Sequence, residues 1–166
     1  QIEAVAHDIA KRADGNFLYA RVVSRTLMDL DRLDGPLPDS ALAAFVADLT
    51  LRFKNDITRV HDLLRALAWG EGKGLTRRVW ASIASVLSLE GAIYNERDIR
   101  WVLDHAGAYI IESGEAGQAV YQLAHKAFTD HYRTQHAAVL AHSLITQVLT
   151  EGVSGADWLN ADGYLS

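Results

Sequence analysis

The chain has no cysteine, so disulfide bonds, thiolate metal sites and cysteine nucleophiles are excluded. It also has no run of the roughly 18 apolar residues that a membrane-spanning helix needs. Basic residues are in the minority, because 21 acidic side chains outnumber 16 lysines and arginines and give a net charge of −5. That balance disfavours broad electrostatic attachment to nucleic acid or to anionic lipid. We therefore expect neither nucleic acid nor membrane among the partners of this chain.

The residues that are present have the composition of a globular protein. Of the 166 residues, 49% are hydrophobic and 22% are charged, which argues against disorder. This length suffices for one ordinary domain or two small packed subdomains. The chain starts at Gln1, inside a helical pattern and not at a methionine. We therefore expect it to be a piece of a longer, cytoplasmic protein.

The first third of the sequence is typical of helices. Apolar residues recur at helical spacing in three segments, which are separated by Asp14-Gly15-Asn16 and by Gly35-Pro36-Leu37-Pro38. Asp39 or Ser40 can cap the third of these helices, which is expected to bury Phe45. We predict a small helical bundle over residues 1–54.

The remaining sequence changes character. Three short helical patterns are followed by a predicted hairpin at about 108–124, with its loop at Ser113–Gly117, and then by a helix that opens at His125. Asn95 is a plausible cap for the third helix, with Asp98 three residues on. This order of elements is that of a winged-helix module. The predicted fold is therefore mainly α: a helical bundle over 1–54, then a winged-helix subdomain with a two-stranded wing over 55–135. A C-terminal helix and the start of a following helical region occupy 136–166.

The most informative stretch runs from Tyr121 to Arg133, where a strand leads directly into a helix. His125 stands at the junction, with an apolar helix face behind it. An imidazole changes its protonation near neutral pH and can give a proton to a phosphate oxygen. The alternative is a surface or helix-capping histidine that binds nothing. His125 is the candidate binding residue that this stretch suggests.

Several segments together resemble a known family. The segment Ala13–Ala20 resembles the part that follows the nucleotide-binding core in NACHT-type signalling ATPases, which belong to the STAND class along with the NB-ARC proteins. The blocks Leu75–Trp80, Asp98–Ile111 and Tyr121–Phe128 resemble the winged-helix domain of the same proteins, and Gly155–Leu159 resembles the start of the helical region after it. The resemblance spans nearly the whole chain.

The resemblance implies a regulatory arm that senses the nucleotide state of a preceding domain in the same polypeptide. In this family the arm closes over bound ADP, and exchange for ATP releases it for self-assembly of the parent protein. His125 matches the histidine that contacts the β-phosphate, while Gly15, Asn16 and Phe17 match the turn on the adenine side. The NB-ARC branch usually has proline where this chain has Phe17. The alternative for Phe17 and Leu18 is a helix start that packs into the bundle core.

We expect no catalysis from this chain itself. A phosphate-binding loop needs Gly-x-x-x-x-Gly-Lys-Ser/Thr between a strand and a helix. The nearest sequence is Gly70–Gly74, in which Lys73 precedes a glycine and a helix comes before the loop. No acidic pair after a hydrophobic strand supplies a Mg²⁺ ligand. ADP or ATP would thus be held mainly by a domain outside this chain, and the chain needs no cofactor of its own.

Four histidines cluster in the sequence without forming a metal motif. Even if one helix contained all four histidines, those on one face of it would be eleven positions apart. That separation is roughly 16 Å along the helix axis, which is too far for one metal ion. These residues are His125, His131, His136 and His142.

Two other functions stay open. A protein-interaction adaptor is one of them, because the winged-helix module is shared by proteins with different functions. A DNA-binding winged helix would read DNA with residues 96–105, which hold more acidic than basic side chains, and the wing over 108–124 has no lysine or arginine. Phosphate contact requires the opposite sign, so DNA binding is the less favoured alternative.

Overall fold

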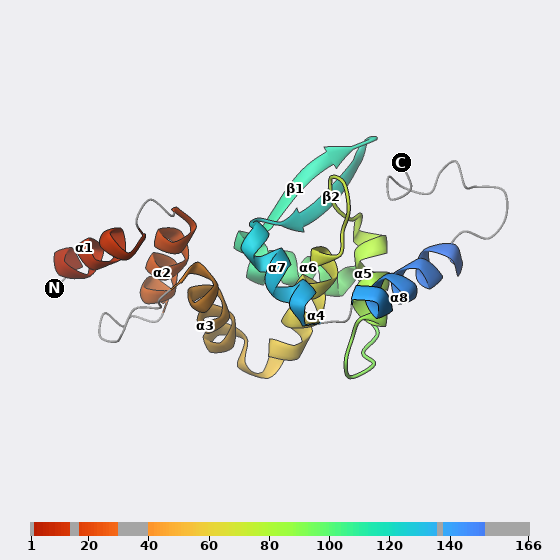
Figure 1. Cartoon of the computed structure of the whole chain (residues 1–166), viewed down its shortest axis with the longest axis horizontal. Coiled ribbons are helices and arrows are strands. Elements are labelled where there is room, and N and C mark those ends of the chain that lie inside the picture. Colours follow the sequence, from red (N-terminus) through yellow and green to blue (C-terminus); the bar gives the residue numbers. More distant parts are fainter. Residues whose placement is uncertain (1, 14–16, 30–39, 136–137, 152–166) are drawn as a thin grey trace. The chain divides into compact units, whose positions relative to one another are not determined.

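The computed structural model describes residues 2–13, 17–29, 40–135 and 138–151. They form a mainly helical protein with one small antiparallel sheet, as predicted (Figure 1). The chain divides into two compact units, Gln1–Ile57 and Thr58–Ser166. The sequence pattern had placed this boundary at Lys54–Asn55. In the described ranges, no helix combines the length and apolar character needed to cross a membrane.

In the first unit, α1 and α3 both contact α2. Tyr19 and Val23 of α2 are buried, as are Phe45 and Leu49 of α3. The elements are α1 (Ile2–Ala13), α2 (Phe17–Asp29), α3 (Ala41–Phe53) and the short η1 (Lys54–Asp56).

The start of α3 is set by a side-chain cap. Ser40 has extended backbone, and its Oγ accepts a hydrogen bond from the Ala43 N–H at 3.1 Å. This satisfies one of the donors that a helix start leaves open. Of the two predicted caps, Ser40 is thus confirmed, and Asp39 lies outside the described residues.

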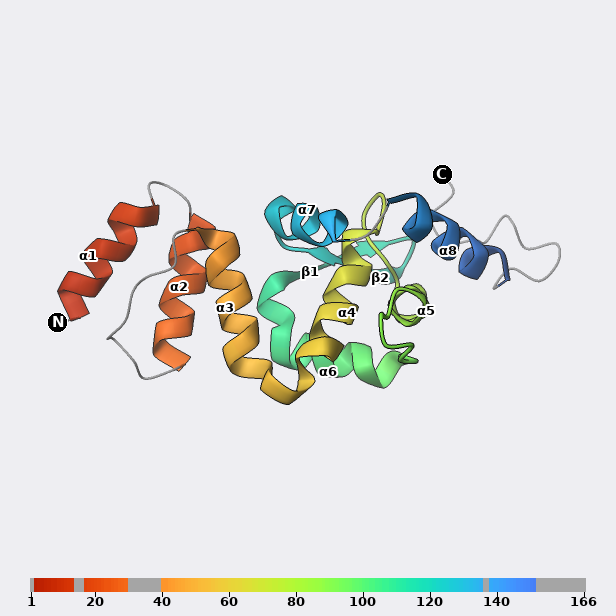
Figure 2. The same cartoon turned by 60° about the horizontal axis from the view of Figure 1, so that its bottom comes forward.

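The second unit packs four helices and a hairpin around α4. Figure 2 shows α4 between α6 on one side and the hairpin with α7 on the other. Trp80 of α5 is fully buried, and its Nε1–H donates to the Leu63 carbonyl oxygen of α4 at 2.8 Å. The elements are α4 (Ile57–Ala68), α5 (Arg77–Val86), α6 (Glu96–Ala106), η2 (Gly107–Tyr109), β1 (Ile110–Glu115), β2 (Gln118–Leu123), α7 (Lys126–Thr134) and α8 (Ala138–Glu151).

The last helix, α8, belongs to this second unit. It contacts α5, and Ala141 and Ile145 on its inner face are buried. The sequence pattern had assigned 136–166 to a separate segment, whereas the compact unit continues from Thr58 through α8.

The hairpin turn is tighter than the predicted loop at Ser113–Gly117. Strand β1 continues to Glu115, β2 resumes at Gln118, and these two residues are paired. Only Ala116 and Gly117 remain as the turn, with φ values of 47° and 79°. Positive φ at both central positions is what a type I′ turn requires, and this turn matches the twist of the strands it joins.

A single residue of the loop after α4 joins the sheet beside β2. Leu75 and Tyr121 exchange two backbone hydrogen bonds of 2.9 Å, so Leu75 extends the hairpin by one antiparallel bridge. Gly74 comes just before it, with φ +121°, and a Cβ placed there would lie 2.3 Å from the Tyr121 carbonyl oxygen. Only glycine fits so close to another backbone. The Gly70–Gly74 loop thus positions Leu75 for its bridge to β2.

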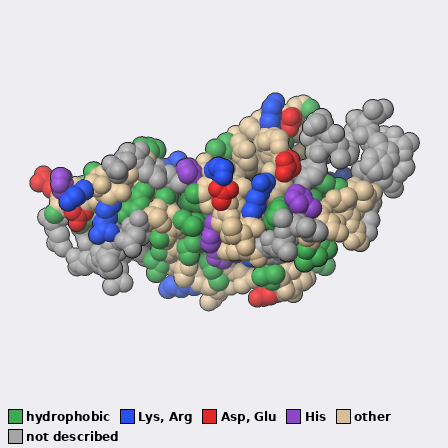
Figure 3. Space-filling view, viewed as in Figure 1, with side chains coloured by type: hydrophobic (Ala, Val, Ile, Leu, Met, Phe, Trp, Pro, Cys, Tyr) green, Lys and Arg blue, Asp and Glu red, His purple; other side chains and the backbone are tan. Residues whose placement is uncertain are grey.

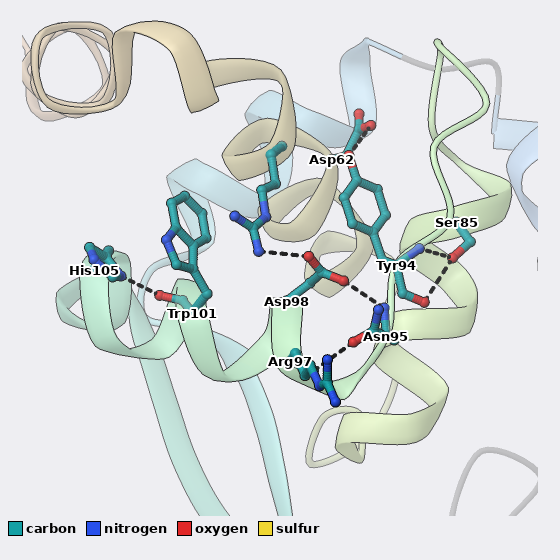
Figure 4. A network of polar contacts seen from close by, with 9 residues as sticks. Asp62, Ser85, Tyr94, Asn95, Arg97, Asp98, Trp101 and His105 are labelled. Atoms are coloured by element: carbon teal, nitrogen blue, oxygen red, sulfur yellow. Dashed lines mark hydrogen bonds and ion pairs between the residues drawn. The ribbon is translucent and has the colours of Figure 1, made fainter.

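A buried carboxylate fixes the loop between α5 and α6 (Figure 4). Asp62 of α4 accepts one hydrogen bond from Arg65 at 2.6 Å and another from the Tyr94 hydroxyl at 2.9 Å. The Tyr94 N–H also donates to Ser85 Oγ at 2.8 Å. Burial and the hydrogen bond to Asp62 raise the pKa of the Tyr94 hydroxyl, which therefore stays protonated as the donor.

The predicted capping box at the start of α6 is confirmed. The Asn95 side chain accepts from the Arg97 N–H, and Asp98 accepts from the Asn95 N–H, both at 2.9 Å (Figure 4). Asp98 also forms an ion pair with Arg59 of α4 at 2.6 Å. The Arg59 guanidinium lies 3.9 Å from the centre of the Trp101 ring. The cap thereby ties α6 to α4.

We predict that Gly74→Ala destabilises the second unit by more than about 1 kcal/mol, because alanine meets both an unfavourable φ and the Tyr121 carbonyl. Urea unfolding followed by circular dichroism measures this. Gly114→Ala is the matched control, since a Cβ at Gly114 has nothing within 4 Å. Equal stability of the two variants would contradict the account.

We further predict that Asp62→Asn lowers the free energy of unfolding by about 3 kcal/mol, because Arg65 is left buried without an opposing charge. Tyr94→Phe should cost about 2 kcal/mol through the lost hydrogen bond to a carboxylate. Asp104→Asn on the exposed face of α6 is the control and should change stability by no more than about 0.5 kcal/mol. A loss in Asp62→Asn no larger than in this control would overturn the role of Asp62.

Candidate functional site

His125 lies between the end of β2 and the start of α7. The strand ends at Leu123, and the Ala124 N–H donates to the Tyr109 carbonyl oxygen at 2.8 Å. His125 then has extended backbone, with φ −151° and ψ 137°, and is the N-cap of α7. The helix therefore begins one residue later than predicted, at Lys126, and the imidazole is exposed.

The cap determines which ring nitrogen carries the proton. The Nδ1 atom of His125 accepts a hydrogen bond from the Ala127 N–H at 3.1 Å. An accepting nitrogen has no proton, so the neutral ring carries its proton on Nε2. An exposed histidine thus presents an N–H donor while its other nitrogen holds the helix start. His125 is thus a surface residue that caps a helix, as in one of the two interpretations that the sequence left open, and its contact with a phosphate stays a prediction.

The surroundings of His125 favour an anion. The N-terminal end of α7 carries the positive end of the helix dipole, where phosphate groups are stabilised. Lys126 is exposed and pairs with Asp130 at 2.5 Å. An exposed pair of this kind contributes little, so Lys126 can exchange Asp130 for another anion at small cost. Figure 3 shows histidine, basic and acidic side chains close together on the surface over α7.

Two buried aromatic residues hold α7 in place behind this surface. Phe128 is fully buried, and its ring meets Tyr109 edge to face with centroids 5.8 Å apart. One turn later, Tyr132 is also buried, with its hydroxyl 2.8 Å from Nδ1 of His61 on α4. These contacts fix the orientation of α7 and therefore the position of His125 at its start.

Two histidines have lowered pKa values, His61 on α4 and His131 on α7 itself. Burial and the nearby charge of Arg65 lower the pKa of His61, and the same two causes lower the pKa of His131. Burial raises the pKa of the Tyr132 hydroxyl, which stays protonated and shares a hydrogen bond of 2.8 Å with Nδ1 of His61. This pair serves packing and lies apart from the exposed ring of His125.

The adenine-side residues are only partly described. Gly15 and Asn16 lie outside the described residues, whereas Phe17 is the first residue of α2 and is 78% exposed. The alternative in which Phe17 packs into the bundle core is therefore wrong. Phe17 belongs to the first compact unit and His125 to the second.

The other clustered histidines have individual surroundings. His131 lies 3.0 Å from the Gln135 amide, and the His142 ring meets Trp69 edge to face at 5.3 Å. Within the ranges that the structure describes, no group of three or more histidine, aspartate or glutamate side chains could hold a metal ion. His136 falls outside those ranges.

The structure also contains a pocket that sequence reasoning missed. It has a volume of about 500 Å³ and lies between α5, α6 and β1. Its lining combines charged side chains of both signs with the apolar Leu103 and Ile110. The lining residues are Arg77, Arg100, Leu103, Asp104, Gly107, Ile110 and Glu112. They come from four elements, α5, α6, η2 and β1, so no local pattern could have brought them together.

Comparison with known proteins identifies no relative: no protein family, curated protein or solved structure matches this chain.

We predict that the stability of the protein falls as the pH drops below about 6.5, the usual pKa of a histidine. The folded state resists protonation of His61, so the unfolded state binds more protons and stability rises with pH through this range. Urea unfolding at pH 7.5 and at pH 5.5 measures the loss.

His61→Asn should show a smaller loss, because an amide oxygen can accept from Tyr132 and does not titrate. The control His7→Asn changes an exposed histidine of α1 and should behave like the unchanged protein. An identical pH dependence in His61→Asn would contradict the role of His61.

Proposed function

We propose that this chain is the nucleotide-state-sensing arm of a STAND-class, NACHT-type signalling ATPase. It performs no chemistry itself and closes over ADP held by a preceding domain of the same cytoplasmic polypeptide. The first unit corresponds to the helical domain and the second to the winged-helix domain of such an arm.

The order of elements in the second unit supports a winged helix. A helix, a short strand, two helices and a two-stranded wing follow each other in that module. Here α4 leads to the bridging residue Leu75, then to α5 and α6, and finally to β1 and β2. The isolated bridge between Leu75 and Tyr121, which the sequence pattern did not predict, occupies the place in this order where the module has its short strand.

The observation that carries the proposal is the exposed imidazole of His125 at the end of the wing. A ring sealed in the hydrophobic interior could not meet an outside ligand, whereas this ring is exposed and has its proton on Nε2. Lys126 and the α7 dipole add positive potential beside it. The site therefore suits a phosphate group that is presented by another domain.

In the proposed mechanism, Nε2–H of His125 donates to the β-phosphate of ADP when the arm is closed. A hydrogen bond to a charged group contributes about 1.5–3 kcal/mol. That energy can change the ratio of closed to open arms by about tenfold or more. Phe17 would approach the adenine, in keeping with its exposure. Exchange for ATP removes the β-phosphate contact and frees the arm, which exposes surfaces for assembly of the parent protein.

A protein-interaction adaptor is the second candidate, and the loop between α5 and α6 favours it. Leu89 and Ile93 are 73% and 87% exposed. The same loop is held by Ser85 and by Tyr94, so it presents apolar side chains without further ordering cost. Exposed apolar residues on a rigid loop are typical of protein contacts.

Nucleic-acid binding has less support. Helix α6, which would enter the major groove, exposes Glu96 and Asp104 beside its two arginines. The wing adds Glu112 and Glu115. Such a surface repels phosphates.

We predict that His125→Ser in the parent protein, with its nucleotide-binding domain, speeds the release of fluorescently labelled ADP by about tenfold or more. Serine can still cap α7, but it is too short to reach a phosphate. Stopped-flow fluorescence measures the release rate, and basal activity should rise in parallel.

Two comparisons make this test specific. His125→Ala also loses the cap, so it should release ADP as fast as His125→Ser but be less stable by about 1 kcal/mol. The control His105→Ala truncates an exposed histidine at the end of α6 and should leave release unchanged. Unaltered ADP release in His125→Ser would overturn the proposal.

A further inference from the structure

The pocket between α5, α6 and β1 is a concave site that the proposed function does not use. Its volume of about 500 Å³ lies within the usual range for small-molecule sites, which is roughly 300–1,000 Å³. All the elements that line it belong to the second compact unit. The pocket is therefore formed by this unit alone and needs no residue from the first.

One face of α6 forms a wall of the pocket. Arg100, Leu103 and Asp104 are at the helical spacing i, i+3 and i+4, so they lie side by side on this face. Gly107 follows one turn later, with φ −56°, and a Cβ there would meet nothing within 4 Å. The wall thus carries a basic, an apolar and an acidic side chain, and it has open space at its end.

The other lining residues repeat this combination of side chains. Arg77 comes from α5, while Glu112 and the apolar Ile110 come from β1. Arg77 Nε donates to the Tyr121 hydroxyl at 3.0 Å, which fixes the guanidinium and leaves its terminal nitrogens for a further acceptor. Basic and acidic side chains are equal in number in the pocket, so its lining has no net formal charge.

These charges are not neutralised by contacts with one another. Within the described residues, the side chains of Arg100, Asp104 and Glu112 form no hydrogen bond and no ion pair. By contrast, Arg59 and Asp98 at the start of α6 pair directly at 2.6 Å. Unpaired charges of both signs in one pocket are complementary to a ligand that carries both signs itself.

The apolar side chains and the size of the pocket narrow the class of ligand further. Leu103 and Ile110 are half-buried and offer apolar surface to the body of a ligand. An extended dipeptide holds its ammonium and carboxylate groups at most roughly 7 Å apart. Its two ends can therefore reach separate charged partners in a pocket of this volume, while its side chains meet the apolar residues.

We infer that this pocket binds a small peptide zwitterion, a dipeptide with free termini and apolar side chains. Arg77 and Arg100 donate to its carboxylate, and Asp104 and Glu112 accept from its ammonium group. The inference is independent of nucleotide binding, so its failure would leave the proposed function unaffected.

Titration of the full chain with leucyl-leucine, followed by NMR of the backbone amides, tests this inference. We expect a Kd on the order of 0.1 mM, with the largest shifts at the amides that line the pocket. N-acetyl-leucyl-leucine lacks the ammonium group and leucyl-leucine amide lacks the carboxylate, so each should bind at least about tenfold more weakly. These blocked peptides are measured on the unchanged protein, so this comparison needs no variant to fold.

Matched variants then locate the two charges. Arg100→Gln should weaken binding of leucyl-leucine about tenfold but leave that of the amide unchanged, because the amide has no carboxylate to lose. Asp104→Asn should likewise weaken leucyl-leucine and leave the N-acetyl peptide unchanged. Gly107→Leu should weaken all three peptides, because its side chain takes up open space at the pocket. Arg97→Gln, on the same helix but outside the pocket, is the control and should bind normally.

Three results would each overturn the inference. The first is absence of binding at about 10 mM leucyl-leucine. The second is equal affinity for leucyl-leucine and either blocked peptide. The third is an Arg100→Gln variant that binds leucyl-leucine as well as the Arg97→Gln control does.

Discussion

The hydrogen bond from the Ala127 N–H to Nδ1 of His125 is the interaction on which the site depends. It satisfies an open donor at the start of α7, and it also leaves the proton of the ring on Nε2. A single contact thus joins a folding requirement to the N–H donor that the proposed phosphate contact would use. A serine or aspartate would cap the helix as well, but neither offers an N–H donor to a ligand.

Packing contacts in the rest of the second unit fix both ends of α7 and thereby keep this hydrogen bond in place. Phe128 packs against Tyr109 at the base of the hairpin, and Tyr132 reaches His61 on α4. The hairpin is itself held to the helices through the bridge at Leu75. Buried packing is rigid, so the exposed ring is positioned by residues that have no role in the proposed phosphate contact.

Local features of the sequence were sufficient for much of this structure. The capping box at Asn95, the helix order and the strand that runs into His125 follow from spacing over a few residues. The bridge of Leu75 and the hydrogen bond from Tyr94 to Asp62 join residues far apart in the chain, and no local pattern encodes them. Likewise, apolar spacing could not decide whether the first residue of α2 faces the core or the surface, and the ring there is exposed.

The position of the proton on His125 is the most direct test of the central claim, and nitrogen-15 NMR of the imidazole measures it. Two-bond proton–nitrogen correlations at pH 8 distinguish the two neutral forms of the ring. The account predicts a proton on Nε2 and an unprotonated Nδ1 that accepts from the Ala127 N–H. A proton on Nδ1, or equal populations of the two forms, would contradict it.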